Sequence, residues 1–331
     1  MHRWIILILI ATVLLDGAPL LRAQVISTPT ASAGDFAGLV DIGDDRRIYL
    51  ECRGSGSPTV ILEAGFRTRA DVWSDDLVQP DAPRTMVFQG VAKFTRVCAY
   101  DRPGTATVLD DGLHPSRSDP VTMPRNAELS VADLHALLAA AEIPGPYVLV
   151  GHSYGGMLVR LFAAEYPDEV AGMVLVDAFS EHLKVHLTPA QWTAYDGIFQ
   201  PVPPALNDYA ALEFTELDRS VEQVRAASQA SPPREMPLVV LSRGQAMAMP
   251  SNLPGGLTGA LLEGAWTASQ SDLAALLPDA RHEIALESEH YIQLQQPELV
   301  IAAVRAVVDA VRDPASWSRA TPVAPPAHTS N

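Results

Sequence analysis

Short apolar runs recur along the 331-residue chain, and stretches long enough to form helices lie between them. The runs read PTVILEAG, TRVCAYDRPG, GPYVLVGHS, AGMVLVDA, MPLVVLSRG and ARHEIAL. A continuous apolar run is typical of a strand that is buried on both faces, and strands alternating with helices form a mostly parallel sheet covered on both sides. The sequence therefore predicts an α/β fold. A hairpin in GLVDIGDDRRIYLECRGSG is expected to precede it.

One interval breaks this alternation. About sixty residues separate VLVDA from PLVVLSRG, which is too many for a single crossover helix. The interval is rich in aromatic residues, and Thr188 followed by Pro189 is typical of a helix cap and first turn. We interpret residues 178–235 as a helical lid over the active edge of the sheet.

Both ends of the chain are expected to lie outside the domain. Arg3 precedes a run of uncharged, mostly apolar residues, 4–15, which is shorter than the roughly 20 residues that span a bilayer. This pattern predicts a signal peptide over 1–23 and export to the cell envelope or medium without a stable membrane anchor; an uncleaved N-terminal anchor is the alternative. A flexible spacer (24–35), the domain (36–313) and a disordered tail (314–331) are expected to follow.

Charge and composition exclude several function classes. The net charge of −16 argues against nucleic-acid binding, because a phosphate backbone requires clustered Lys and Arg. The sequence contains neither the GxxxxGK[ST] nor the GxGxxG phosphate-binding pattern, and its two cysteines are too few for a zinc site. We therefore expect neither a metal nor a cofactor. In an oxidising compartment, the two thiols can pair.

The segment LVGHSYGGM places Ser153 in a tight turn between a predicted strand and a predicted helix. Gly151 and Gly155 flank the serine, as expected if the turn brings its neighbours against the adjacent strand and helix. Such a turn presents the serine as a nucleophile. It also leaves the backbone N–H of Tyr154 at the helix N-terminus, where it can stabilise an oxyanion.

A serine nucleophile needs a base, and His290 is the best placed of the nine histidines. It follows the last predicted strand and precedes the last predicted helix. His152 lies inside the turn and cannot reach its own neighbour. The others fall in less suitable segments: the signal, tail, lid, a polar loop, a helix face or a strand (His2, His328, His182, His186, His114, His135 and His282).

Together these residues resemble the α/β-hydrolase superfamily, and within it a secreted bacterial serine esterase-like subgroup, from about residue 38 to 312. The segments RVCAYDRPG, GHSYGG, VLVDA and EHYIQLQQPE carry the resemblance. It implies a mostly parallel eight-stranded sheet with helices on both faces and a lid inserted after the sixth strand. Where many members have His-Gly after the third strand, this chain has Ala64-Gly65-Phe66, so the N–H of Phe66 is expected to be the second oxyanion donor.

The resemblance also bears on the acid of the triad. Members usually carry it after the strand that follows the lid, but PLVVLSRG is followed by no nearby Asp or Glu. Asp177, which ends the preceding strand, is used by some members, and we assign the acid to it. The alternatives are that Asp177 only caps a strand, and that Glu263 or Asp272 is the acid.

The strand order that the resemblance implies places the second strand beside the fourth. Cys52 lies on the former and Cys98 on the latter, and neighbouring strands bring Cα atoms within disulfide distance. We therefore expect a Cys52–Cys98 disulfide.

Ser153, His290 and Asp177 predict hydrolysis of a small-molecule carboxylic ester through an acyl-enzyme. A peptidase or a lactonase with the same triad is the alternative among enzymes, and a non-catalytic binding protein is the alternative outside them. Dehalogenases and epoxide hydrolases of this fold carry aspartate at the turn, so the serine argues against both. The sequence does not specify which ester is the substrate, nor the oligomeric state.

Overall fold

The computed structural model describes residues 34–82, 84–199, 201–249 and 253–319. The expected signal peptide, nearly all of the expected spacer and the end of the expected tail lie outside these residues. Among the described helices, none is long and apolar enough to cross a membrane.

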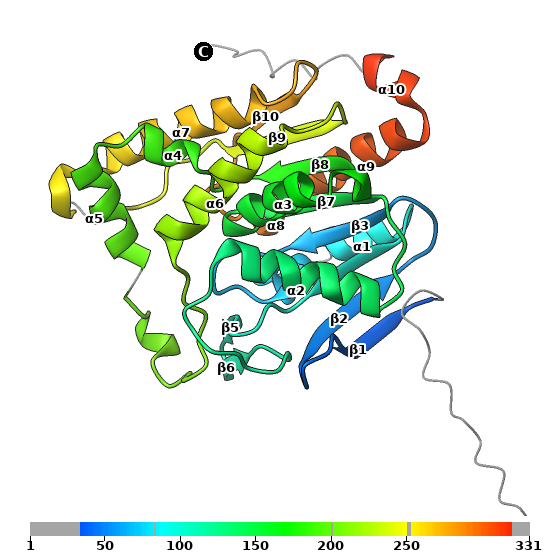
Figure 1. Ribbon diagram of the computed structural model, residues 1–331, viewed down its shortest axis with the longest axis horizontal. Helices are drawn as coiled ribbons and strands as arrows, with labels where there is room; N and C mark the ends of the chain where they lie inside the picture. Colours follow the sequence, from blue (N-terminus) through cyan, green and yellow to red (C-terminus); the bar gives the residue numbers. More distant parts are fainter. Residues whose placement is uncertain (1–33, 83, 200, 250–252, 320–331) are drawn as a thin grey trace, which may run out of the picture.

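An eight-stranded sheet forms the centre of the protein (Figure 1). Its strand order is β1-β2-β4-β3-β7-β8-β9-β10, antiparallel at the β1–β2 and β2–β4 pairs and parallel elsewhere. In chain order the strands are β1 (Phe36–Asp41), β2 (Arg47–Arg53), β3 (Thr59–Glu63), β4 (Val97–Tyr100), β7 (Tyr147–His152), β8 (Val170–Val176), β9 (Leu238–Arg243) and β10 (Arg281–Ala285). The predicted hairpin and the mostly parallel α/β sheet are confirmed.

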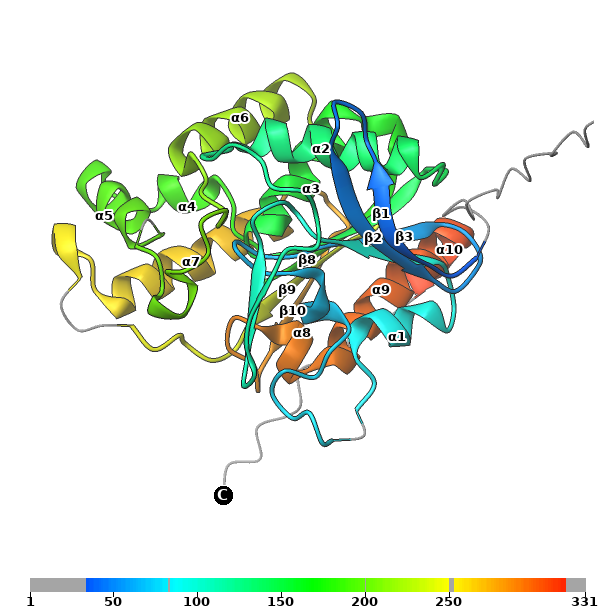
Figure 2. The same ribbon diagram turned by 90° about the horizontal axis from the view of Figure 1, so that it is seen from below.

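Helices cover both faces of the sheet, as Figure 2 shows edge-on. One face packs against α2 (Ala127–Ala140), α3 (Tyr154–Glu165) and α6 (Leu217–Ala230). The other packs against α1 (Val87–Ala92) and α9 (Pro297–Arg312). Because each apolar strand sends alternate side chains to opposite faces, the continuous runs seen in the sequence fill two hydrophobic cores.

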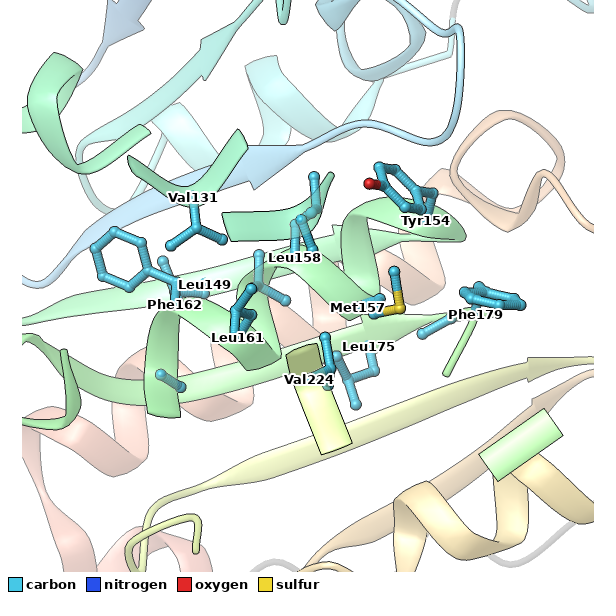
Figure 3. Close-up of a cluster of buried hydrophobic side chains, with 14 of the residues drawn as sticks. Val131, Leu149, Tyr154, Met157, Leu158, Leu161, Phe162, Leu175, Phe179 and Val224 are labelled. Carbon is cyan, nitrogen blue, oxygen red and sulfur yellow. The ribbon is translucent and has the colours of Figure 1, made fainter. Parts of the chain in front are cut away.

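The core on the α3 side includes side chains from β7 and α3, the elements that flank Ser153 in the sequence (Figure 3). Leu149 from β7 and Leu175 from β8 pack with Met157 and Phe162 from α3, and all four side chains are fully buried. Full burial of one such side chain contributes about 1.5–3 kcal/mol. The strand and the helix on either side of Ser153 are therefore rigidly held.

The segment between β8 and β9 follows the sixth strand of the sheet in chain order. It contains α4 (His182–Val185), α5 (Pro189–Phe199), the 3-10 turn η4 (Pro204–Leu206) and α6. Thr188 accepts a hydrogen bond on Oγ1 from the backbone N–H of Gln191 (3.4 Å), as expected for a helix cap. Within the segment expected to be the lid, α6 packs on α2 and α3. Its apolar stripe of Leu217, Val221 and Val224 requires that contact.

Two further elements differ from the sequence analysis. A small hairpin, β5 (Ala106–Leu109) with β6 (Gly112–Pro115), occupies a region for which no element was expected. The tail does not begin at 314, because Pro314–Arg319 form helix α10. Trp317 anchors this helix: its Nε1–H donates to the carbonyl of Asp279 (3.0 Å), and the Arg281 guanidinium lies 3.7 Å from its ring centroid.

The two cysteines lie directly opposite each other on β2 and β4. They form the expected Cys52–Cys98 disulfide, which is fully buried in the core. The bond joins the N-terminal hairpin to the parallel part of the sheet and leaves no free cysteine in the described part of the chain. Such a bond stabilises a fold mainly by restricting the unfolded chain.

Candidate active site

Ser153 lies in a sharp turn between β7 and α3. Its backbone has φ 51° and ψ −124°, a conformation that residues with a side chain rarely adopt. Holding a residue there costs about 1–3 kcal/mol, and such strain is retained where the surrounding structure enforces it. Here the N–H of Ser153 donates to the carbonyl of Val176 (3.2 Å), and its carbonyl accepts from Gly156 and Phe179 (both 2.9 Å).

Steric contacts explain why glycine occupies the positions on either side of the turn. A Cβ on Gly151 would lie 2.5 Å from the carbonyl oxygen of Gly155. A Cβ on Gly155 would lie 2.5 Å from the carbonyl oxygens of both Glu63 and Ala64. The turn is thus packed too closely against β3 and the start of its own helix for any side chain at either position.

The fold brings Asp177 and His290 together across 113 residues of sequence. Asp177 directly follows β8, while His290 lies in the turn between β10 and α8 (Ile292–Gln295). The imidazole Nδ1 is 2.6 Å from Asp177 Oδ2, so Nδ1–H donates to the carboxylate. Ser153 and His290 both line the same cavity. The three residues selected from the sequence therefore gather at one edge of the sheet.

Asp177 is fully buried and every lone-pair direction of its carboxylate is engaged. Oδ2 also accepts from Arg243 Nη1 (2.7 Å), while Oδ1 accepts from Trp266 Nε1 (2.9 Å) and the backbone N–H of Arg243 (3.3 Å). Burial by itself would raise the pKa of Asp177, but the hydrogen bond and charge of His290, the charge of Arg243 and the hydrogen bond of Trp266 lower it to about 2. Asp177 is therefore an anion at neutral pH.

The two alternative acids have other hydrogen-bond partners. Glu263 belongs to α7 (Gly259–Ala274), and its carboxylate accepts two hydrogen bonds from Arg243 (3.2 and 2.8 Å). Asp272, on the same helix, accepts from His186 Nε2 (2.6 Å) near the surface. The hydrogen bond from His290 Nδ1 goes to Asp177.

His152 supports the loop that carries His290. Its Nε2 lies 2.9 Å from the backbone carbonyl of His290, so Nε2–H is the donor. The two imidazole rings are 4.7 Å apart between centroids. Burial lowers the pKa of His152 to about 3, which keeps its ring neutral. The histidine next to the serine is thus a support for His290.

The loop after β3 approaches the serine closely. A Cβ on Gly65 would lie 3.3 Å from Ser153 Cβ. The buried guanidinium of Arg102 donates to the carbonyls of Ala64 (2.7 Å) and Gly65 (2.6 Å). Phe66, the next residue, lines the cavity together with Tyr154, and their rings are 6.0 Å apart between centroids. The two residues expected to supply oxyanion donors therefore lie beside Ser153.

A buried cluster of charges under this loop links it to the segment inserted before β9. Glu213 accepts from Arg102 Nε (2.8 Å) and from the backbone N–H of Arg67 (2.6 Å). Arg102 also donates to Glu63 at the end of β3. Because breaking a buried ion pair leaves an uncompensated charge, this cluster fixes the path of the loop.

A cavity of about 300 Å³ opens above Ser153. Its walls are mostly apolar and come from the loop after β3, the serine turn, the inserted segment, the region between β9 and α7, and the His290 loop. The residues are Gly65, Phe66, Thr68, His152, Ser153, Tyr154, Phe179, Tyr195, Ile198, Thr215, Leu217, Arg243, Met247, Met249, Gly259, Leu262, Glu263, Trp266, His290 and Tyr291. No residue of the loop 103–125 is among them.

The sequence analysis missed Arg243 and Trp266, both of which bind the carboxylate of Asp177. The role of Arg243 could have been predicted from the sequence, because Arg243 ends a strand at the same edge as Asp177. The role of Trp266 could not have been predicted, since Trp266 comes from the middle of a helix. Within the described ranges, no cluster of three or more His, Cys, Asp or Glu side chains is arranged to hold a metal ion.

Comparison with known proteins agrees with this architecture. Residues 58–229, more than half of the chain, match the model of the alpha/beta hydrolase fold family. An uncharacterized protein of Schizosaccharomyces pombe is 33% identical over 151 residues, covering 40% of this chain and 26% of its own length. Lipase LipV of Mycobacterium tuberculosis is 36% identical over 102 residues, covering 30% of this chain and 38% of its own.

A solved structure, that of a putative lipase from Acinetobacter baumannii AYE, covers 84% of this chain and 92% of its own with a TM-score of 0.52 at 18% identity. At that identity the likeness concerns the fold alone. The chain spans between 20% and 41% of the length of the first curated relatives that it matches. The matched family model, the strained serine turn and the order of the sheet agree, and the chain belongs to the α/β-hydrolase superfamily.

Proposed function

We propose that the protein is a serine hydrolase that cleaves carboxylic esters of small molecules through an acyl-enzyme. The observation that carries the proposal is the hydrogen bond between His290 Nδ1 and the buried Asp177, at the rim of the cavity that also contains Ser153. A carboxylate on Nδ1 selects the imidazole tautomer whose Nε2 can accept a proton from serine. The superfamily membership and the lipase among the relatives are consistent with this chemistry.

In the proposed reaction, Ser153 Oγ attacks the ester carbonyl while His290 Nε2 takes the hydroxyl proton. The backbone N–H groups of Phe66 and Tyr154 stabilise the resulting oxyanion, and each such donor is typically worth about 10²–10³ in rate. The C–O bond then breaks, and the alcohol leaves with the proton held by His290. A water, deprotonated by His290, attacks the acyl-enzyme and releases the acid and the free serine.

The apolar cavity favours an uncharged acyl or alcohol group. Phe179 and Tyr195 from the inserted segment stack with parallel rings, 6.1 Å apart between centroids, and the Trp266 ring lies 6.4 Å from that of Phe179 between centroids. Burial raises the pKa of Tyr195 above its usual value, so this side chain is neutral. We assign the role of the lid to the part of the inserted segment that contributes Phe179, Tyr195 and Ile198.

Reaction with a fluorophosphonate probe tests the proposed nucleophile. The wild-type protein is expected to be labelled on Ser153 and to lose its hydrolysis of p-nitrophenyl butyrate in proportion to the labelling. Ser153→Ala should remain unlabelled, since the probe requires an activated hydroxyl. Peptide mapping by mass spectrometry locates the adduct. A folded wild-type protein that is neither labelled nor active would support the non-catalytic alternative, whereas labelling with cleavage of amides or lactones only would support the other enzyme classes.

The size of the cavity sets an expectation for the acyl chain. At about 300 Å³ it lies at the lower end of the range for ligand pockets. We expect kcat/KM to rise by up to about fourfold per added methylene from acetate towards hexanoate, because each buried CH₂ is worth about 0.8 kcal/mol. The value of kcat/KM should fall for palmitate, because the cavity cannot enclose that acyl chain. Assays with p-nitrophenyl esters of increasing chain length measure these kcat/KM values.

Ile198→Trp narrows the cavity and should lower kcat/KM for hexanoate more than for acetate. Val185→Trp changes a residue that is 75% exposed and outside this cavity, so it is the matched control. A preference for palmitate in the wild type, or equal effects of the two variants, would contradict the assignment of this cavity to the acyl group.

We also propose that the protein is exported. The N-terminal pattern of Arg3 and the apolar run 4–15 is typical of a secretory signal, and the Cys52–Cys98 disulfide is the form that thiols take in an oxidising compartment.

A further inference from the structure

Arg243 stands at the end of β9, beside Asp177, with a side chain that is only 4% exposed. Each end of its guanidinium has a separate partner. Nη1 donates to Asp177 Oδ2 (2.7 Å), while Nε and Nη2 donate to the two oxygens of Glu263 (3.2 and 2.8 Å). The bidentate contact with Glu263 fixes the plane of the guanidinium and thereby its position at Asp177.

Trp266 restrains the same group from a different direction. The centre of the guanidinium lies 4.7 Å from the Trp266 ring centroid, while Nε1–H of this ring donates to Asp177 Oδ1. Both Trp266 and Glu263 come from α7, so one helix positions the carboxylate and its cation together. The result is a row of side chains in which basic and acidic groups alternate, from His290 through Asp177 and Arg243 to Glu263.

We propose that Arg243 is a positioning residue for the reaction: it holds the carboxylate of Asp177 in place and, balanced by Glu263, sets the electrostatic field at His290. This proposal rests on the proposed function. Arg243 supplies a positive charge that disfavours a protonated His290, and Glu263 supplies a negative charge, farther away, that partly offsets it. The pair thereby sets the balance of charge beside the carboxylate that holds His290.

Three titratable groups beside this row stay neutral at assay pH. Burial lowers the pKa of His152 to about 3, and burial raises the pKa of Tyr195 and of Tyr291 above their usual values. Asp177, with its pKa of about 2, stays ionised. The acid limb of the pH dependence of kcat/KM is therefore expected to respond to Arg243 and Glu263.

Removing the charge of Arg243 and removing the charge of Glu263 should move this acid limb in opposite directions. Arg243→Gln leaves Glu263 unbalanced, favours protonated His290 and should shift the limb to higher pH by about one unit, since one unit corresponds to about 1.36 kcal/mol. Glu263→Gln leaves Arg243 unbalanced and should shift the limb to lower pH, by about half a unit because its charge is more distant. A purely structural role would lower activity without shifts of opposite sign.

Three further variants sharpen the test. Arg243→Lys keeps the charge and should hold the limb near its wild-type position even if kcat falls. The double variant Arg243→Gln/Glu263→Gln removes both charges and should return the limb towards wild type. Asp272→Asn is the matched control on the same helix, because Asp272 binds His186 near the surface.

Profiles of kcat/KM for p-nitrophenyl butyrate measure these shifts. Acid limbs of Arg243→Gln and Glu263→Gln that coincide with wild type, or that move in the same direction, would overturn the proposal. If Arg243→Gln does not fold, the test uses Glu263→Gln alone. An acid limb of Glu263→Gln at or above the pH of the wild-type limb would then overturn the proposal. Fluorophosphonate labelling of wild-type Ser153 separates these outcomes from a failure of the proposed function, which would abolish labelling as well.

Discussion

Ser153→Ala and His290→Ala are each expected to lower kcat for p-nitrophenyl butyrate by about 10⁵–10⁶-fold while leaving the protein folded. The loss is large because nucleophile and base act as one unit, so removing either eliminates the covalent route. Steady-state kinetics with purified variants measure the effect. Alanine at 153 still occupies the strained turn, which is enforced by its backbone hydrogen bonds to Val176, Gly156 and Phe179.

The double variant provides a control within this experiment. If Ser153 and His290 act together, removing both should cost little more than removing one. Circular dichroism and thermal unfolding verify that each variant is folded. Retention of more than a few per cent of wild-type turnover by either folded variant would refute the assignment of that residue.

Asp177→Asn is expected to lower kcat by about 10⁴-fold, because the amide favours the wrong tautomer of His290. An amide oxygen at the position of Oδ2 would also present less negative charge to Arg243, so some loss of stability is expected in addition. The kinetic measurement is therefore paired with denaturant unfolding. The effect on kcat should persist under conditions in which the variant is fully folded.

Asp272→Asn is the matched control for Asp177→Asn, and its kcat is expected to remain within a few-fold of wild type. Its carboxylate is on the outer part of α7, where it meets His186. An active Asp177→Asn together with a collapse of Asp272→Asn or Glu263→Gln would show that the acid follows the inserted segment and that Asp177 only ends a strand. Glu263→Gln has its own expected signature, a downward shift of the acid limb.

Local patterns in the sequence were sufficient to predict the fold class and the serine turn. Continuous apolar runs must be buried on both faces, so their alternation with helix-length stretches left few architectures other than a covered parallel sheet. Gly151 and Gly155 marked the turn because their lack of a side chain reflects contacts within a few residues or with the neighbouring strand. Asp177 was assigned from the resemblance to members that carry the acid at the end of this strand.

The tertiary structure decided what depends on side chains that are distant in sequence. Helix α6 packs on α2 and α3, and α10 is held by Trp317 against Asp279 and Arg281. Glu263, an alternative acid in the sequence analysis, pairs with Arg243 at the cavity. Sequence periodicity reports which face of an element is apolar, but it carries no information on which polar groups from different elements meet. The environment of Asp177 is set by Arg243 from β9 and Trp266 from α7, and only folding brings those side chains together.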